Sequence, residues 1–234
     1  CSSIARVSVS ITVMAPSSTD SKYPQLLYTE GKAPSQKKSM SFYSYLSNFQ
    51  MVQVGVGNDA WDALKESSVG VFLGFYEQDH IFSAELVHYI LTHQLVVKKN
   101  YEIWSLIDCQ PIRLSLIEFG EIIGLNIGPF DVGDTIDVDH REFWEELHVS
   151  PAVGPNLVEL REVLLTRCKS WCFEKRRSVG WLCILHIAVY GIALTARIPL
   201  EAAKRVLNAD AFERYPWEDL SMCYKYGHMQ LLPA

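Results

Sequence analysis

The residues whose types and spacing most suggest chemistry are the glycines of VGVGNDA, at residues 54–60. Gly55, Gly57 and Ala60 fit the G-x-G-x-x-G/A fingerprint of a turn that binds a dinucleotide pyrophosphate at a helix N-terminus. Glu77 follows about 20 residues after Gly57, which suits an acidic group that binds a ribose hydroxyl. One alternative is therefore a nucleotide-binding oxidoreductase that uses Gly55, Gly57 and Glu77.

Two features of the same stretch argue against a dinucleotide site. The preceding apolar run, at 51–54, is short and contains Gln53, whereas a central parallel strand is a near-continuous apolar run. Asp59 would lie where the pyrophosphate approaches, and its carboxylate would repel that anion. We therefore favour a loop with two glycines before a helix capped by Asn58 or Asp59, and we expect no cofactor.

Two other sets of residues are weak candidates for metal binding. Cys168 and Cys172 would share a helix face, but a structural zinc site usually pairs two C-x2-C knuckles and no second pair exists here. The aspartates within 131–139 lack the spacing of an EF-hand loop. We therefore expect no metal site and interpret the two cysteines as buried structural thiols.

Charge and cysteine usage limit the partners that we expect. The formal net charge is −6, whereas proteins that bind the phosphate backbone of nucleic acids usually carry excess Lys and Arg. The six cysteines are too sparse for a disulfide framework, which indicates an intracellular protein. A basic cluster and an aromatic tripeptide are instead candidates for contact with a protein partner. These candidate partner-binding residues are Lys175, Arg176, Arg177, Tyr215, Pro216 and Trp217.

The uncharged stretch at 179–196 raises the question of a membrane span. It is apolar, it has 18 residues, and a basic flank precedes it, as in a single-span protein. It also contains His186 and two glycines, and its length is at the lower limit for spanning. We favour a core helix that is buried on all sides, and expect no membrane association.

Helical patterns dominate the elements that would position these residues. Between 101 and 116, β-branched and aromatic residues flank the turn-like pair Asp108-Cys109, which predicts a β-hairpin. Ser115 and Glu118 form a capping-box pattern before a helix over 116–125. Further helices are expected over 58–66, 83–97, 140–147, 155–167, 170–196, 199–212 and 217–228, with a helix or strand over 42–54 and a strand or buried turn over 69–76.

These patterns predict a mainly α fold, with a single helical domain and a small β-hairpin. Residues 1–21 are interpreted as a disordered or linker-like extension, 22–228 as the domain, and 229–234 as a tail. We expect the hairpin and the helix after it to pack against the long apolar helix. The expected core residues in this region are Trp104, Ile112, Leu114, Leu116, Phe119, Ile122 and Leu125.

Four segments, in a consistent order, resemble one known plant family. They are YPQLLYTEGKAP from residue 23, FSAELVHYILTHQL at 82–95, YEIWSLIDCQPIRLSLIEFGEIIGLNIG at 101–128 and IPLEAAKRVLNADAFERYPW at 198–217. The family is a domain of unknown function (DUF1985) found in crucifers, often upstream of a Ulp1-like cysteine peptidase in transposon-associated genes. The chain departs from the family pattern after Trp217, where Glu218-Asp219 replaces the usual Gly-Arg.

The resemblance implies a non-catalytic interaction or scaffold module with an unidentified protein partner, in the nucleus. A Ulp1-like peptidase would need a His-Trp pair and a Cys-Gly nucleophile, with the histidine activating the thiolate. No histidine in this chain precedes Trp and no cysteine precedes Gly. We therefore expect no enzymatic activity here, although a longer parent protein would carry the peptidase.

Overall fold

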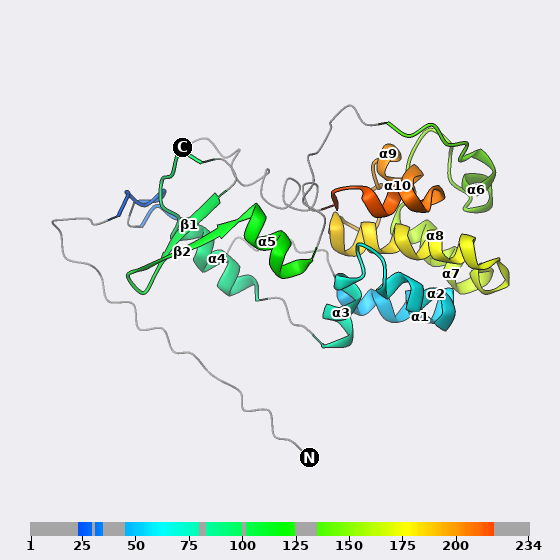
Figure 1. The fold of residues 1–234 in the computed structure, drawn as a ribbon, viewed down its shortest axis with the longest axis horizontal. Coiled ribbons are helices and arrows are strands. Elements are labelled where there is room, and N and C mark those ends of the chain that lie inside the picture. The colour runs from blue at the N-terminus through cyan, green and yellow to red at the C-terminus, as the bar shows by residue number, and fades with distance from the viewer. Residues whose placement is uncertain are drawn as a thin grey trace, which may run out of the picture. The chain divides into compact units, whose positions relative to one another are not determined.

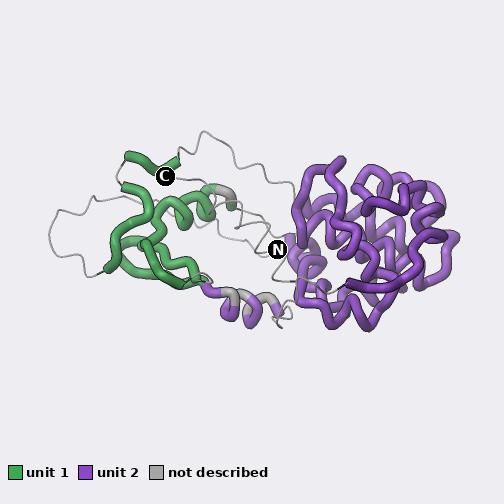
Figure 2. The backbone as a smooth tube through the Cα atoms, turned by 90° about the horizontal axis from the view of Figure 1, so that it is seen from above, with its two compact units in different colours: residues 1–38, 83–114 green, residues 39–82, 115–234 purple. Residues whose placement is uncertain are grey.

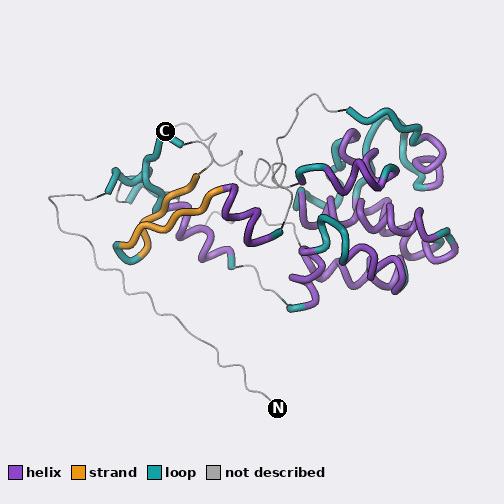
Figure 3. The backbone as a smooth tube through the Cα atoms, viewed as in Figure 1, coloured by secondary structure: helices purple, strands orange, loops and turns teal. Residues whose placement is uncertain are grey.

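The computed structural model describes residues 23–29, 31–34, 45–79, 83–99, 102–124 and 135–217. The chain divides into two compact units, shown in different colours in Figure 2. Unit 1 comprises residues 1–38 and 83–114, and unit 2 comprises 39–82 and 115–234. The described elements are mostly helices with one two-stranded antiparallel sheet, which confirms the predicted mainly α fold (Figure 3). That residues 22–228 act as a single domain stays a prediction.

Unit 1 combines a short helix with the predicted hairpin. Helix α4 (Ala84–Thr92) begins at Ser83, whose hydroxyl accepts a hydrogen bond from the backbone N–H of Leu86 at 3.2 Å. Strands β1 (Glu102–Ile107) and β2 (Gln110–Ser115) form the hairpin (Figure 1). The chain leaves α4 earlier than predicted because residues 94 and 95 instead form antiparallel bridges, to Ser105 and Leu26 respectively.

The hairpin turn has a left-handed backbone at both of its central residues. Asp108 and Cys109 both have positive φ, 48° and 61°. This left-handed pair matches the twist of the two strands, as in two-residue hairpin loops. The expected core role of Ile112 is wrong, because 50% of this residue is exposed on β2, while Trp104 and Leu114 are partly buried.

The core of unit 2 surrounds one buried helix. Helix α8 (Phe173–Ile184) continues directly into the π-helical turn η3 (Leu185–Val189), and every residue of 178–190 is buried. This confirms the predicted core helix within the apolar stretch. Across the described ranges, no helix is both long and apolar enough to cross a membrane.

Shorter helices of unit 2 pack around α8. Helices α1 and α2 both contact it, as does α7. The bounds of the remaining described elements are η1 (Leu46–Asn48), α1 (Phe49–Val56), α2 (Asn58–Lys65), α3 (Val71–Glu77), α5 (Leu116–Ile123), α6 (Arg141–Glu146), α7 (Leu157–Thr166), η2 (Cys168–Ser170), α9 (Leu200–Lys204), η4 (Arg205–Leu207) and α10 (Ala209–Arg214).

Two local predictions for unit 2 have different outcomes. The capping box at α5 is confirmed: the Ser115 hydroxyl accepts from the Glu118 backbone N–H at 3.1 Å, and Glu118 accepts from the Ser115 N–H at 3.0 Å. The strand or turn predicted over 69–76 is wrong, because α3 occupies most of this stretch. A short apolar run fits a buried helix as well as a buried strand, so its pattern alone does not decide.

Several predictions fall outside the described part of the chain. They are the extension 1–21, the tail 229–234, most of the acidic loop, most of the helix expected over 217–228, Leu125, and the side chains of Leu116, Phe119 and Ile122.

Candidate functional site

The glycine motif lies on two consecutive helices rather than at a strand–turn–helix. Gly55 is inside α1 and Gly57, with φ of 84°, separates α1 from α2. The dinucleotide fingerprint requires a strand before its first glycine. Since residues 51–54 are helical here, the structure contradicts the dinucleotide-turn interpretation of Gly55 and Gly57.

Arg176 occupies the junction between α1 and α2, where the nucleotide-binding alternative would place the pyrophosphate of a dinucleotide. Its Nη1 donates to the carbonyl of Val56 at 2.5 Å and to Oδ1 of Asp59 at 2.6 Å, and its Nη2 donates to Oδ2 of Asp59 at 2.5 Å. Hydrogen bonds from this guanidinium hold the pKa of Asp59 at about 2, well below its usual value. The proposed capping role of Asn58 or Asp59 is wrong, because no side chain caps α2.

Glu77, the third residue of the nucleotide alternative, also has contacts inside unit 2. Its Oε1 accepts a hydrogen bond from the indole Nε1 of Trp61 at 3.1 Å. The same oxygen lies 3.4 Å from Nζ of Lys65. These contacts tie the end of α3 to α2, and they account for Glu77 structurally.

The other two cations of the predicted basic cluster also have partners within unit 2. Nζ of Lys175 lies 2.7 and 2.9 Å from the two carboxylate oxygens of Glu146. The guanidinium carbon of Arg177 lies 4.6 Å from the ring centroid of Trp181, in a cation–π contact. The residues of 175–177 therefore do not form a free basic patch.

The aromatic tripeptide lies mostly in the core of unit 2. Tyr215 is 9% exposed and Trp217 is 1% exposed, while Pro216 is partly buried. The Trp217 indole donates to the backbone carbonyl of Phe212 at 2.9 Å, and the guanidinium of Arg205 lies over the Tyr215 ring. Contact between these residues and a partner stays a prediction.

The two cysteines of the weak zinc pattern lie in different environments. Cys168 is buried, and burial raises the pKa of its thiol to about 11, whereas Cys172 is exposed. Among the described residues, no three or more His, Cys, Asp or Glu side chains form a group that could hold a metal ion. The interpretation of the two cysteines as buried structural thiols therefore holds for Cys168 and is wrong for Cys172.

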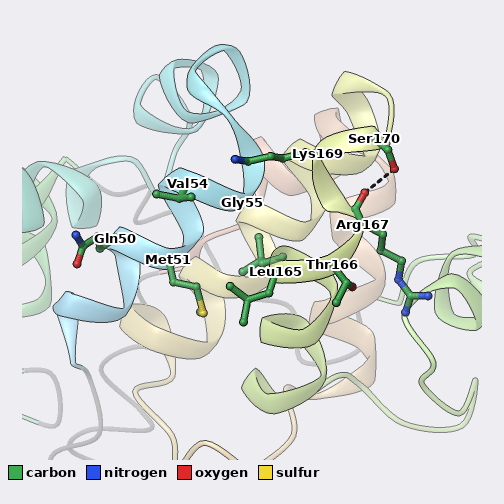
Figure 4. Close-up of a pocket in the computed structure, with 10 residues that line it drawn as sticks. Gln50, Met51, Val54, Gly55, Leu165, Thr166, Arg167, Lys169 and Ser170 are labelled. Atoms are coloured by element: carbon green, nitrogen blue, oxygen red, sulfur yellow. Dashed lines mark hydrogen bonds between the residues drawn. The ribbon is translucent and has the colours of Figure 1, made fainter.

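The sequence did not predict a groove that lies on unit 2 between α1 and the α7–η2 segment (Figure 4). Its volume is about 460 Å³. We call it the α1–α7 groove. The residues that line it are Gln50, Met51, Val54, Gly55, Leu164, Leu165, Thr166, Arg167, Lys169 and Ser170. Two of its apolar side chains are unusually exposed, Val54 at 59% and Leu165 at 65%.

The α1–α7 groove has an apolar floor and a polar, cationic end. Met51 and Leu165 line the groove from the two facing helices, and Lys169 extends from η2 toward α1 (Figure 4). Nη1 of Arg167 lies 2.7 Å from Nε2 of His148, and the Ser170 hydroxyl donates to the Arg167 carbonyl at 2.7 Å. No acidic residue lines the groove.

One sequence signal could have indicated this groove. In α7 the buried positions 157, 160, 163 and 164 form the stripe that faces the core. Val158 and Leu165 fall outside this stripe, and both are more than half exposed. Apolar residues beyond the core stripe of an amphipathic helix indicate a second contact surface.

Comparison with known proteins gives one family. The family model described as "Domain of unknown function (DUF1985)" matches residues 91–226, more than half of the chain. Comparison with curated proteins and comparison with solved structures each gave no match. The matched range contains α7 and η2, while α1 precedes it.

Proposed function

The chain belongs to the family of the domain of unknown function DUF1985, and we propose that it acts as a non-catalytic protein-interaction module. The observation that carries this proposal is the α1–α7 groove, with the exposed side chains of Val54 and Leu165. Apolar side chains that remain exposed beside a concave surface are typical of sites that bind another molecule.

The chemistry of the other candidate residues supports a binding role rather than a catalytic one. Arg176, Lys175 and Glu77 are engaged in ion pairs or hydrogen bonds within unit 2. The thiols of Cys168 and Cys183 are buried, and burial raises the pKa of both. A nucleophilic cysteine needs a lowered pKa and an accessible sulfur.

The resemblance in the sequence supports a more specific version of this proposal. In a longer parent protein of a plant transposon-associated gene, the module would lie upstream of a Ulp1-like peptidase. It would bind the target of that peptidase or position it, in the nucleus. A groove of this size would accept side chains of a protein partner without any cofactor.

A capture experiment with matched variants tests the interaction role. The tagged 234-residue chain and its variants Leu165→Asp and Leu194→Asp are each incubated with plant nuclear extract, and the retained proteins are identified by mass spectrometry. Leu194 is 49% exposed and does not line the groove, so its substitution is the matched control. We expect a specific set of proteins with the parent chain and with Leu194→Asp, and its loss with Leu165→Asp.

Two results would contradict the proposal. Either the parent chain retains no specific protein, or Leu165→Asp retains the same set as the control. Circular dichroism and a thermal melt of each variant show whether the fold is intact. Because Leu165 is 65% exposed, a charge at this position has little effect on folding.

A further inference from the structure

We propose that the α1–α7 groove binds an acidic amphipathic helix of a partner protein. This inference rests on the proposed interaction function and adds the chemistry of the partner. It follows from three features of the groove: its apolar floor, its helical walls without a free strand edge, and the positive charge of its rim.

The floor selects an apolar face. Met51 and Val54 come from α1, and Leu165 comes from α7 (Figure 4). Gly55 has no side chain, and an added Cβ would lie 2.7 Å from Cδ2 of Leu164, so the two helices approach closely at this point. Apolar side chains of a ligand helix, spaced at i, i+3, i+4 and i+7, would cover this floor.

The walls select a helix rather than an extended peptide. An extended peptide gains affinity chiefly by adding backbone hydrogen bonds to an exposed strand edge. The walls of this groove are the helices α1 and α7 with the η2 turn, which offer no strand edge. A helix satisfies its own backbone groups and loses none of them when it docks.

The rim selects negative charge. Arg167 and Lys169 both line the groove, Lys169 is exposed, and Lys169 has no ion pair in the described part of unit 2. No acidic residue lines the groove beside these two cations.

The carboxylate of Glu159, on α7, does not weaken the positive charge of the rim. Glu159 accepts from Nη2 of Arg197 at 2.9 Å, so its carboxylate is already paired. The formal net charge of the whole chain is −6, so the positive charge of this rim is opposite in sign to the net charge of the chain. An acidic ligand would be repelled by the chain at large and attracted at this rim, which favours docking here.

The test uses designed peptides and the 234-residue chain. Three fluorescein-labelled peptides of about 18 residues, roughly five helical turns, are compared by fluorescence anisotropy. The first has leucines at i, i+3, i+4 and i+7 with glutamates elsewhere on its exposed face. The second replaces these glutamates with lysines. The third keeps the acidic composition and scrambles the leucines.

We expect the acidic amphipathic peptide to bind at least about tenfold more tightly than the other two. Lys169→Glu should weaken this binding by roughly three- to tenfold, because an exposed charge contact is replaced by repulsion. Lys98→Glu, at an exposed position of unit 1, is the matched charge control and should leave the affinity unchanged. Leu165→Asp should weaken binding about tenfold or more, and Leu194→Asp should not.

Each opposite result overturns the inference. If the basic peptide binds as tightly as the acidic one or more tightly, the partner is not acidic. If the scrambled peptide binds equally well, the partner does not dock through an amphipathic helical face. Failure of all three peptides to bind, or no effect of Leu165→Asp, removes the groove as a helix site. A concentration-dependent dimer that Leu165→Asp dissociates would show that the groove pairs two copies of this chain instead.

These failures are distinct from failure of the proposed function. The capture experiment depends on an intact Leu165 surface with any protein partner, whereas the peptide experiment depends on the sign of charge and on helical spacing. If capture depends on Leu165 but no peptide binds, the module still binds proteins and only the chemistry of the partner is wrong.

Discussion

Arg176 holds together two helix ends that a single glycine separates. The carbonyl of Val56 is among the last of α1, where helical carbonyls lack an intrahelical partner, and Nη1 of Arg176 donates to it. Asp59 lies in the first turn of α2, where a carboxylate is favoured by the helix dipole. The same guanidinium binds that carboxylate through two nitrogens, a geometry that a lysine ammonium does not offer.

This arrangement predicts a pH-dependent contribution of Asp59 to stability. The pKa of Asp59 is about 2 in the folded chain and has an ordinary value of 3.8 without the contact. A depressed folded-state pKa stabilises the fold above the ordinary value, and this contribution is lost as the pH falls from about 4 toward 2. Asp59→Asn should therefore lower the urea midpoint at pH 7, and its difference from the parent chain should shrink below pH 4.

Asp137→Asn is the matched control, because Asp137 is exposed and lies outside the described helices. Its urea midpoint should equal that of the unsubstituted chain at pH 7 and at pH 3. A difference between Asp59→Asn and the parent that is equally large at pH 7 and pH 3 would contradict the role of the Arg176 contact.

At the residue scale, the sequence predicts contacts that are local and misses those that are not. The capping box of Ser115 and Glu118 could be predicted because the two residues are three positions apart. Asp59 and Arg176 are separated by 117 positions, so no periodicity or spacing joins them. The nucleotide interpretation arose from this limit, since the glycines were visible in the sequence and the arginine beside them was not.

At the scale of elements, the approach of α1 to α7 depends on Gly55. An added Cβ would lie 2.7 Å from Cδ2, 2.9 Å from Cβ and 3.1 Å from the carbonyl oxygen of Leu164, and the last two atoms cannot move freely. Gly55→Ala should therefore cost about 1–3 kcal/mol in free energy of unfolding through overpacking. This cost exceeds the gain of about 0.5–1 kcal/mol that alanine brings to a helix interior. Chemical denaturation measures the difference.

Gly74→Ala is the matched control for this substitution. Gly74 lies inside α3, and an added Cβ would meet nothing within 4 Å. Alanine should stabilise the chain here by about 0.4–1 kcal/mol, since it restricts the unfolded chain without a clash. If Gly55→Ala were stabilising to a similar degree, α1 and α7 would not be held at the distance that the groove requires.

Elements with a strong local signal could be predicted, and α3 could not. The hairpin was recognisable because two β-rich runs flank the turn-like pair Asp108-Cys109, and α4 because Ser83 precedes an amphipathic run. The segment 71–77 is apolar at most positions, so neither a period of 2 nor one of 3.6 stands out. Its helix follows from packing, with Phe72 and Leu73 buried in the core of unit 2.

At the scale of the whole molecule, the two units differ in how much apolar surface they bury. In the described part of unit 1, the buried apolar side chains are those of Leu91 and Leu95, which are 8% and 5% exposed. Unit 2 has a continuous core that includes Trp61, Trp144, Trp181 and Trp217. Local stability depends on buried apolar contacts, so the two units should open with different free energies.

Native-state hydrogen exchange of the full chain tests this difference. Amides of α4, β1 and β2 should exchange through openings of low free energy, while those of α8 should approach the global free energy of unfolding. The double variant Asp108→Asn/Cys109→Gly should raise the protection of β1 and β2 by about 1 kcal/mol, because its turn accepts positive φ without strain. Cys109→Ala keeps the strain and removes the thiol, so it should give no gain. Equal protection of the hairpin and α8 in the parent chain would mean that the two units unfold as one, in spite of their unequal cores.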